Sequence, residues 1–291
     1  MVTAVFLVSV TLYSNKIAIN SCRPPNHIFR ICIVLFDKQK TNLALTRLNQ
    51  WFHINQLVLN ITETNVIKFK PKTTAHVPLH IYYKDNITDE VKSTKFLGMH
   101  IDNHMIWKNH VEQILPKLSA ACFLIGNLIH TLNLDILCMV YFAYFHLVLQ
   151  YGIIFWGNSA HVHQVFKLQK RVVRVMSGVG PRSSCRSLFR KPKILPIACR
   201  YMLSLMLFIV DNQKDFLTNA YVHGLDTRNK NHLYLPVVSL SCFQKGVSCS
   251  GVKIFNAFQV IYRVMEMTGQ ESKTSCTDTL LLISFIQLLN S

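Results

Sequence analysis

The stretch Trp107–Leu128 reads WKNHVEQILPKLSAACFLIGNL, and its apolar residues recur every three or four positions. The recurring residues are Trp107, Val111, Ile114, Leu118, Cys122 and Ile125. This spacing places them on one face of an α-helix, with a kink expected at Pro116. Similar patterns predict helices near 134–152, 161–177, 197–219 and 251–267. Ser250 is expected to cap the last of these helices, and Gly269 is expected just past its end.

Shorter elements are predicted upstream of this helix. Leu57–Leu59 and Val66–Phe69 are typical of short strands, and Leu79–Tyr83 with Val91–Ile101 predicts a hairpin around Asp85-Asn86. A helix beginning near Thr41 would have an apolar face made of Leu45, Leu48, Trp51 and Phe52.

The beginning of the chain is apolar, reading MVTAVFLVSVTL over residues 1–12. No Lys or Arg precedes this run, so we expect a buried strand or helix rather than a signal peptide. Arg23-Pro24-Pro25-Asn26 is expected to interrupt any regular element that follows.

The charge of the chain is strongly positive. Its 291 residues contain 31 Lys and Arg against 14 Asp and Glu, which gives a net charge of +17. No acidic residue lies between Asp135 and Asp211, whereas ten Lys or Arg fall from Lys167 to Arg200. Such a surplus favours a polyanionic partner, which is either a nucleic acid or an acidic membrane surface.

Four of these cations have helical spacing. Lys167, Lys170, Arg171 and Arg174 would share one face of a helix, with Leu168, Val172 and Val175 on the other. Arg182 and Arg186 follow directly, and then Arg190, Lys191 and Lys193. A solvated helix face is the ordinary interpretation of four charges. Because no acidic residue is nearby, the pattern favours contact with a phosphate backbone.

The segment Ile136–Trp156 is the best candidate for a membrane span, since it contains no Asp, Glu, Lys or Arg. His146, Gln150 and Tyr151 would leave polar groups unsatisfied in hydrocarbon, and no Lys or Arg lies at its ends. We therefore expect a buried helix that is apolar on all sides, and we keep a basic membrane protein as the alternative.

The nine cysteines are scattered without a Cys-x-x-Cys pair, so neither a disulfide framework nor a zinc site is indicated. Most are expected to be buried small apolar side chains in a reducing compartment. Clustered carboxylates that could hold Mg²⁺ are also missing, because Asp89-Glu90 is the first adjacent acidic pair and is expected in a solvated turn.

Several motifs resemble, in order and spacing, the end of the palm and the thumb of non-LTR (LINE-type, jockey-like) retrotransposon reverse transcriptases. The resemblance runs from Thr41 to Tyr262. The motifs are LNQWFHINQLVLNITETNVIKF at Leu48–Phe69, KFLGMHID at Lys95–Asp102, LSAACFLIGNL at Leu118–Leu128, LQYGIIFWG at Leu149–Gly157, FKLQKRVVRVMSG at Phe166–Gly178, CRSLF at Cys185–Phe189, ILP at Ile194–Pro196, HGLDTRNKNHLYLP at His223–Pro236 and GVKIFN at Gly251–Asn256.

The resemblance implies a fold and its boundaries. We expect a mainly α protein with a small α+β part, in which short palm-remnant hairpins precede a helical, thumb-like bundle. Residues 39–105 would be the remnant of the palm, and residues 106–269 the thumb-like and connection-like region. Residues 1–38 and the tail 270–291 do not match the family.

The resemblance also implies what is missing. The family's catalytic Tyr-Ala-Asp-Asp precedes the Trp-Phe pair, and nothing like it occurs here. Glu63 stands where the family has a Lys, and the resemblance implies that this position lies near the incoming triphosphate. Phe96, Leu97 and Gly98 correspond to the family's primer-grip hairpin, although a strand glycine at a bulge is an equally good interpretation of Gly98 alone.

The sequence therefore indicates a degenerate fragment of an RNA-directed DNA polymerase that is not an enzyme as it stands. Its expected partner is RNA or an RNA–DNA hybrid, bound weakly and without sequence preference, in the cytoplasm or nucleus. No small-molecule substrate and no cofactor are expected, although the parent family uses Mg²⁺. A non-catalytic interaction module used by the host is a further alternative.

We predict that the purified chain shows no primer extension with Mg²⁺ or Mn²⁺. The two metal ions of nucleotidyl transfer require carboxylate ligands, and the motif that would supply them is absent. Template-dependent incorporation above that of a mock preparation would contradict this prediction.

Overall fold

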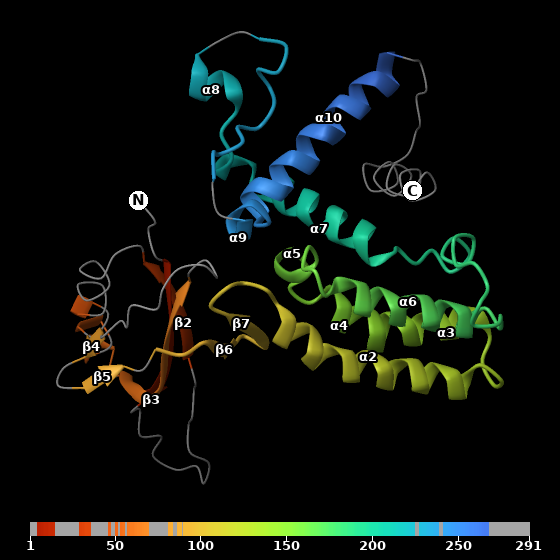
Figure 1. Ribbon diagram of the computed structural model, residues 1–291, viewed down its shortest axis with the longest axis horizontal. Coiled ribbons are helices and arrows are strands. Elements are labelled where there is room, and N and C mark those ends of the chain that lie inside the picture. The colour runs from red at the N-terminus through yellow and green to blue at the C-terminus, as the bar shows by residue number, and fades with distance from the viewer. Residues whose placement is uncertain are drawn as a thin grey trace. The chain divides into compact units, whose positions relative to one another are not determined.

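The fold is described here from a computed structural model, which is mainly helical with small antiparallel sheets (Figure 1). It describes residues 5–14, 29–35, 46–47, 50–51, 53–55, 57–69, 81–83, 86–88, 90–224, 227–238 and 241–267. The chain forms two compact units, Met1–His110 and Val111–Ser291. The expectation of a mainly α fold with a small α+β part is confirmed.

The larger sheet of the first unit has the strand order β2-β1-β3 and is antiparallel. Its strands are β1 (Val5–Ser14), β2 (Phe29–Leu35) and β3 (Leu57–Phe69). The apolar start of the chain is thus a strand. The two short strands expected at 57–59 and 66–69 are the ends of the single strand β3. Strand β1 pairs with residues 57–60 and with residues 65–69, and the register shift between Ser9 and Thr11 leaves residues 61–64 without a partner on β1.

Two hairpins follow in the first unit. Strand β4 (Ile81–Tyr83) pairs with β5 (Asn86–Thr88), and β6 (Ser93–Phe96) pairs with β7 (Met99–Asp102). The expected pairing of 79–83 with 91–101 is therefore wrong. Leu97 (φ 45°) and Gly98 (φ 82°) are the two loop residues between Phe96 and Met99, and positive φ at both is what a type I′ turn requires. The turn folds 91–101 back on itself.

Other expectations upstream fall partly on residues outside the described ones. Residues 46–47, 50–51 and 53–54 are helical, and Trp51 is half exposed rather than on a buried face. Leu45, Leu48, Phe52, Arg23-Pro24-Pro25-Asn26, Gly269 and the tail 270–291 lie outside the described residues.

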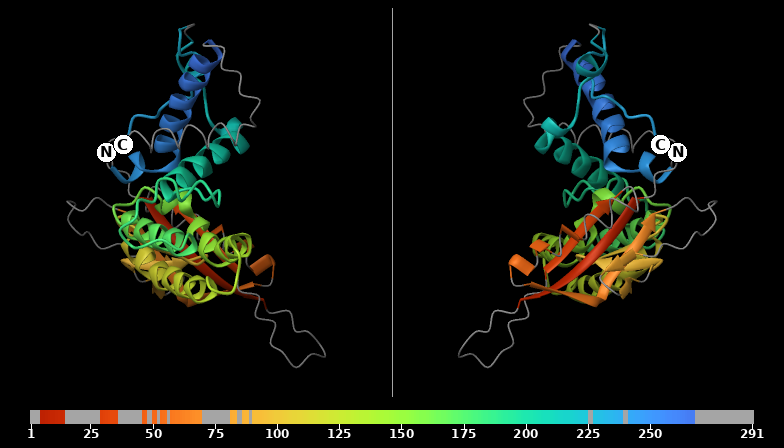
Figure 2. Two further views of the ribbon diagram at one scale, coloured as in Figure 1. Left: turned by 90° about the vertical axis from the view of Figure 1, so that its right-hand side faces the viewer. Right: turned by 90° about the vertical axis from the view of Figure 1, so that its left-hand side faces the viewer.

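Helix α2 (Lys108–Leu128) forms one side of the helical unit, and it passes through Pro116. The sequence periodicity is confirmed, because Trp107 and the five periodic apolar residues of the helix are all buried. Within this unit α2, α6 (Val162–Met176) and α7 (Ile197–Asp211) lie at successive levels (Figures 1 and 2). In the described part of the chain, no helix is both long and apolar enough to cross a membrane.

A continuous helical segment runs through α3 (Leu134–Val140), the π-helix η1 (Tyr141–His146) and α4 (Leu147–Gln150). Its buried residues Leu137, Tyr141, Phe145 and Leu149 are four apart. In an α-helix four residues turn through about 400°, so such a row drifts by about 40° at each step. The wider turn of the π-helix counteracts this drift and keeps the row on one face.

The expectation of one buried, all-apolar helix over 136–156 is wrong in two respects. The helical segment ends at Gln150, where Tyr151 is extended and Gly152 has φ 61°. In addition, Met139, Tyr144 and Leu147 are exposed, because other helices cover only one face of the segment. Helix α5 (Ile153–Trp156) follows and is closely packed.

Close packing of α5 depends on Gly157. A Cβ atom there would lie 2.5 Å from Tyr201 Cδ2 and 2.6 Å from the Ile153 carbonyl oxygen. The indole nitrogen of Trp156 donates to the Tyr151 carbonyl at 2.9 Å, so α5 is folded back onto the residues that precede it.

The expected helix 197–219 is shorter than predicted, since α7 ends at Asp211. Asn212 terminates it by donating from its side-chain amide to the Phe208 carbonyl at 2.8 Å. The short elements η2 (Gln213–Asp215), α8 (Asn219–His223) and α9 (Ser241–Gln244) follow. Ser250 lies inside the π-helix η3 (Val247–Gly251) rather than capping α10 (Val252–Met267), because helical backbone begins earlier than predicted.

The turn that leads into α2 is held by the carboxylate of Asp102. Its oxygens accept backbone N–H groups from His104 at 3.0 Å, Ile106 at 3.0 Å and Trp107 at 2.8 Å. Met105 and Trp107 have positive φ values of 50° and 65°, which are unfavourable for residues with side chains. The hydrogen bonds to Asp102 offset this cost and fix the direction in which α2 begins.

We predict that Asp102→Ala weakens this turn by about 2 kcal/mol, the scale expected for hydrogen bonds to a charged group. Amide hydrogen exchange over residues 103–110 should become faster, whereas the exposed control Asp215→Ala should leave it unchanged. Asp102→Asn keeps one acceptor oxygen and should give an intermediate result. Unaltered exchange in Asp102→Ala would show that the turn is held by other contacts.

Candidate nucleic-acid interface

Helix α6 has one buried face and one cationic face. Its buried residues are Val165, Gln169, Val172, Val173 and Met176. The predicted apolar face is thus displaced slightly, since Val172 is buried whereas Leu168 and Val175 are half-buried. On the other side, Lys167 and Arg171 are exposed, and Lys170 and Arg174 are half-buried.

Gln169 is the one fully buried polar residue in this row, and its amide joins three segments. The side-chain nitrogen donates to Tyr141 Oη at 3.1 Å and to the Leu195 carbonyl at 2.8 Å. The side-chain oxygen accepts the backbone N–H of Ile197 at 2.8 Å. Ile197 is the first residue of α7, where backbone N–H groups have no partner within the helix. Gln169 therefore connects η1, α6 and the start of α7.

The side chain of Tyr141 is completely buried against this amide and stacks on Phe145, with ring centroids 5.2 Å apart. Burial raises the pKa of its phenol, and the hydrogen bond from Gln169 opposes that shift. Burial likewise raises the pKa of the neighbouring Cys122 thiol to about 11, although the positive charge of Arg171 lowers it slightly. Both groups are therefore uncharged at neutral pH, and the interior behind α6 carries no negative charge from them.

The loop between α6 and α7 is tied to the helix by its apolar residues. Phe189 is buried and stacks on Phe166 of α6, with ring centroids 6.4 Å apart. Cys185 is also buried, and its thiol donates to the Lys170 carbonyl at 3.7 Å. Ile194 is buried at the other end of the loop. The CRSLF and ILP motifs thus supply the anchors of this loop.

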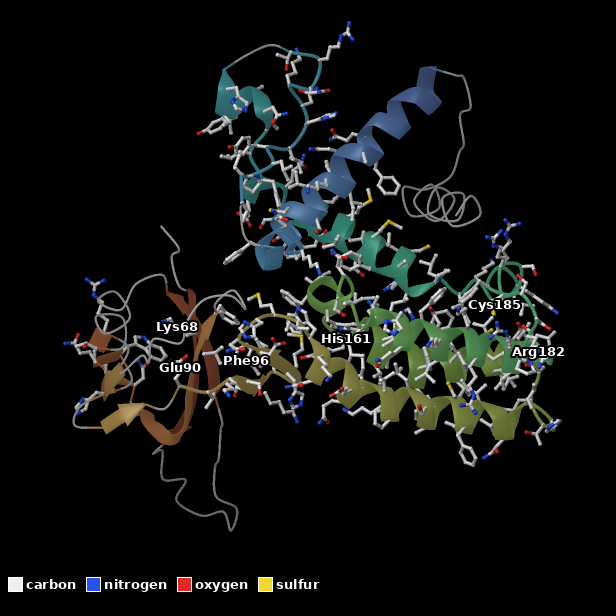
Figure 3. All side chains as sticks on the ribbon, viewed as in Figure 1. Lys68, Glu90, Phe96, His161, Arg182 and Cys185 are labelled. Atoms are coloured by element: carbon white, nitrogen blue, oxygen red, sulfur yellow. The ribbon has the colours of Figure 1, made fainter. Side chains whose placement is uncertain are left out.

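Beside and between these anchors the loop exposes Arg182, Arg186, Arg190, Lys191 and Lys193. We call these five residues, together with Lys167, Lys170, Arg171 and Arg174 of α6, the basic surface. Arg174 links the two parts, because its Nε donates to the Ser183 carbonyl at 2.8 Å. Figure 3 shows Arg182 and Cys185 close together beside α6. The surface is a helix face continued by an anchored loop.

The half-buried cations of this surface differ from the exposed ones in their contacts. Lys170 lies over the Phe166 ring, with Nζ 4.7 Å from its centroid, and Arg174 is held by the loop carbonyl. Arg200, the last of the ten cations, does not belong to the surface. It is half-buried in α7, where burial lowers its pKa. Lys167, Arg171, Arg182 and Arg186 are the predicted residues with the greatest access to a ligand.

The primer-grip-like residues lie in the first unit. Leu97 and Gly98 are exposed at the tip of the β6–β7 hairpin, and Phe96 is half-buried beside it. Gly98 has a positive φ, which glycine adopts without steric cost. It lies in the turn of the β6–β7 hairpin and not at a bulge within a strand. The basic surface belongs to the second unit.

Two residues important to this arrangement were missed in the sequence analysis. In the sequence Gln169 stands out only as part of the FKLQKRVVRVMSG motif, although its spacing places it in the buried row with Val165 and Val172. Asp102 stands out in the sequence only as the end of the KFLGMHID motif, although an Asp before a helix is typical of side-chain hydrogen bonding to backbone. The spacing of Gln169 along its helix and the position of Asp102 before a helix are both local features of the sequence, so both roles can be predicted from it.

Comparison with protein-family models, with curated proteins and with solved structures finds no match. Across the residues that the structure describes, no group of three or more His, Cys, Asp or Glu is arranged to hold a metal ion.

We predict that Gln169→Met lowers the free energy of unfolding by about 3 kcal/mol. Met fills a similar volume but leaves the Ile197 N–H and the Leu195 carbonyl without their partner, and each such buried group costs about 1–3 kcal/mol. Tyr141→Phe removes a single bond and should cost about 1 kcal/mol. Chemical denaturation measures both, with Gln164→Met on the same helix as control. A loss no larger than that of the control would show that the amide contributes no net stability.

Proposed function

We propose that this chain binds the phosphate backbone of RNA or of an RNA–DNA duplex through the basic surface. In this proposal it is a degenerate fragment of a non-LTR retrotransposon reverse transcriptase that binds without catalysing polymerisation. The observation that carries the proposal is the exposure of seven of the nine cations of the basic surface on a segment without any acidic residue. No carboxylate in this segment competes with phosphate for these cations.

The chemistry of the surface favours backbone contact over base recognition. Arg and Lys pair with phosphate oxygens regardless of sequence, and arginine does so with two parallel hydrogen bonds. Exposed, flexible side chains lose conformational entropy on binding. The proposed binding is therefore weak, independent of base sequence and strongly dependent on salt concentration.

The positions of the family-like motifs in the fold support the proposed origin. Leu233 and Asn256 belong to two different motifs, and the Asn256 side chain forms two hydrogen bonds of 2.9 Å with the Leu233 backbone. Gly157, the last residue of LQYGIIFWG, allows close packing against Tyr201. Gln169 of FKLQKRVVRVMSG donates a hydrogen bond to the Leu195 carbonyl of ILP. These motif residues thus contact one another or the core, as expected for pieces of one ancestral domain.

The β6–β7 hairpin is proposed as a second, weaker contact. Its tip exposes backbone at Gly98 and the side chain of Leu97, which suits close approach to a nucleic-acid strand. An RNA partner implies a cytoplasmic or nuclear location for the chain.

We predict that reversing four exposed cations of the basic surface abolishes most of the binding. In fluorescence anisotropy with a labelled RNA–DNA duplex, log K of the parent should fall against log salt with a slope near −3 to −4, about 0.7–0.9 for each of four contacts. The variant Lys167→Glu, Arg171→Glu, Arg182→Glu and Arg186→Glu should bind weakly with a nearly flat slope.

The matched control carries Lys214→Glu, Arg228→Glu, Lys245→Glu and Lys253→Glu. These four cations are also exposed, and the change in net charge is the same, but none belongs to the basic surface. The control should keep most of the affinity and the slope. Equal losses in the two variants would mean that net charge alone attracts the duplex, and the proposed surface would be wrong. Strong preference for one duplex sequence would contradict backbone binding.

A further inference from the structure

The outer side of the α3–η1–α4 segment is apolar and exposed. Its residues are Ile136, Met139, Phe142, Tyr144 and Leu147, which we call the apolar face. The exposed fractions of Met139, Tyr144 and Leu147 are 67%, 59% and 63%. Single exposed apolar residues are ordinary, but five within three turns of one helical segment form a patch.

The size of this patch matches one side of a protein interface. With side chains of about 200 Å² each, the apolar face exposes roughly 500 Å². A standard interface buries about 800 Å² on each partner, of which a little over half is apolar. The apolar face is thus large enough to be the centre of such an interface.

The chemistry of the face indicates a partner that is itself uncharged at the contact. No Asp, Glu, Lys or Arg occurs from residue 136 to residue 156, so the face offers no ion pair to a charged ligand. Burial, together with the positive charge of Arg200, lowers the pKa of His146 beside it, so this imidazole is neutral at pH 7. A phosphate backbone would find no cation to pair with on the apolar face. A second copy of the same face can pack against it without like charges in contact and without burying an unpaired charge.

The π-helix gives the face a shape that suits pairing with itself. Because η1 keeps the buried row aligned on one side, the exposed residues also stay on one side over the length of the segment. Two such segments can pack about a two-fold axis, where the same patch serves both partners.

We propose that the apolar face is the contact between two copies of this chain. Its members all lie outside the basic surface, so a dimer would present two basic surfaces. Each copy carries a net charge of +17, so the two copies repel each other at long range. Salt screens this repulsion, and dimerisation should therefore strengthen as salt is raised. Binding of a nucleic acid should weaken under the same change.

Sedimentation velocity of the full chain over a range of concentrations, at about 0.05 M and 0.5 M salt, tests the proposal. We expect a monomer–dimer equilibrium that is tighter at the higher salt concentration. Met139→Glu with Leu147→Glu places like charges at the contact and should raise the dimer dissociation constant at least tenfold, or about 1.4 kcal/mol. The control Tyr221→Glu alters an exposed aromatic residue of α8 and should behave as the parent.

Circular dichroism establishes that the variants are folded. The uncharged variant Tyr144→Ser gives a second test if the double variant is unstable, and it should also weaken the dimer. A chain that remains monomeric at all concentrations and both salt concentrations would overturn the proposal. So would a dimer whose dissociation constant is unchanged in the folded variants. Because the test contains no nucleic acid, its outcome is independent of the proposed binding function.

Discussion

The buried amide of Gln169 is the interaction on which the helical unit depends. It satisfies a phenol, a carbonyl and a helix-terminal N–H that come from η1, from the residues before α7 and from α7 itself. An apolar residue at this position would leave at least two buried backbone groups without partners. A longer or charged residue would not fit among Val165, Val172 and Val173, which are fully buried. The amide thus fixes α6 against its neighbours by hydrogen bonds as well as by packing.

Fixing α6 also fixes what it presents to solvent. The loop that follows is held at Cys185 and Phe189, and the helix is held at Gln169, so the cations between these points project from a backbone that is already ordered. An ordered backbone reduces the conformational entropy that a ligand must remove on binding. The same helical unit also exposes the apolar face, which lies on the α3–η1–α4 segment. Its two exposed surfaces therefore suit two different partners, a polyanion on one and an uncharged protein surface on the other.

The parts of the fold that could be predicted are those governed by local periodicity. Apolar residues three and four apart predict the buried face of α2, and the same periodicity predicts the bounds of α6 and α10 to within a residue. The errors arose where distant contacts decide the outcome. Strand β3 is held together because β1 pairs with both of its ends, at 57–60 and at 65–69. The 91–101 hairpin is a local exception, because it is set by the positive φ values of Leu97 and Gly98. The exposure of Met139 and Leu147 depends on which face the other helices cover, and the partners of Gln169 lie 26 and 28 residues away.

The most direct test of the central claim is lysine footprinting by acetylation and mass spectrometry, with and without an RNA–DNA duplex. If the basic surface contacts the duplex, Lys167, Lys191 and Lys193 should be protected in the complex. Lys214, Lys245 and Lys253 are equally exposed and should react at the same rate in both states. Uniform protection of all six lysines, or protection of the second group alone, would contradict binding through α6 and its loop.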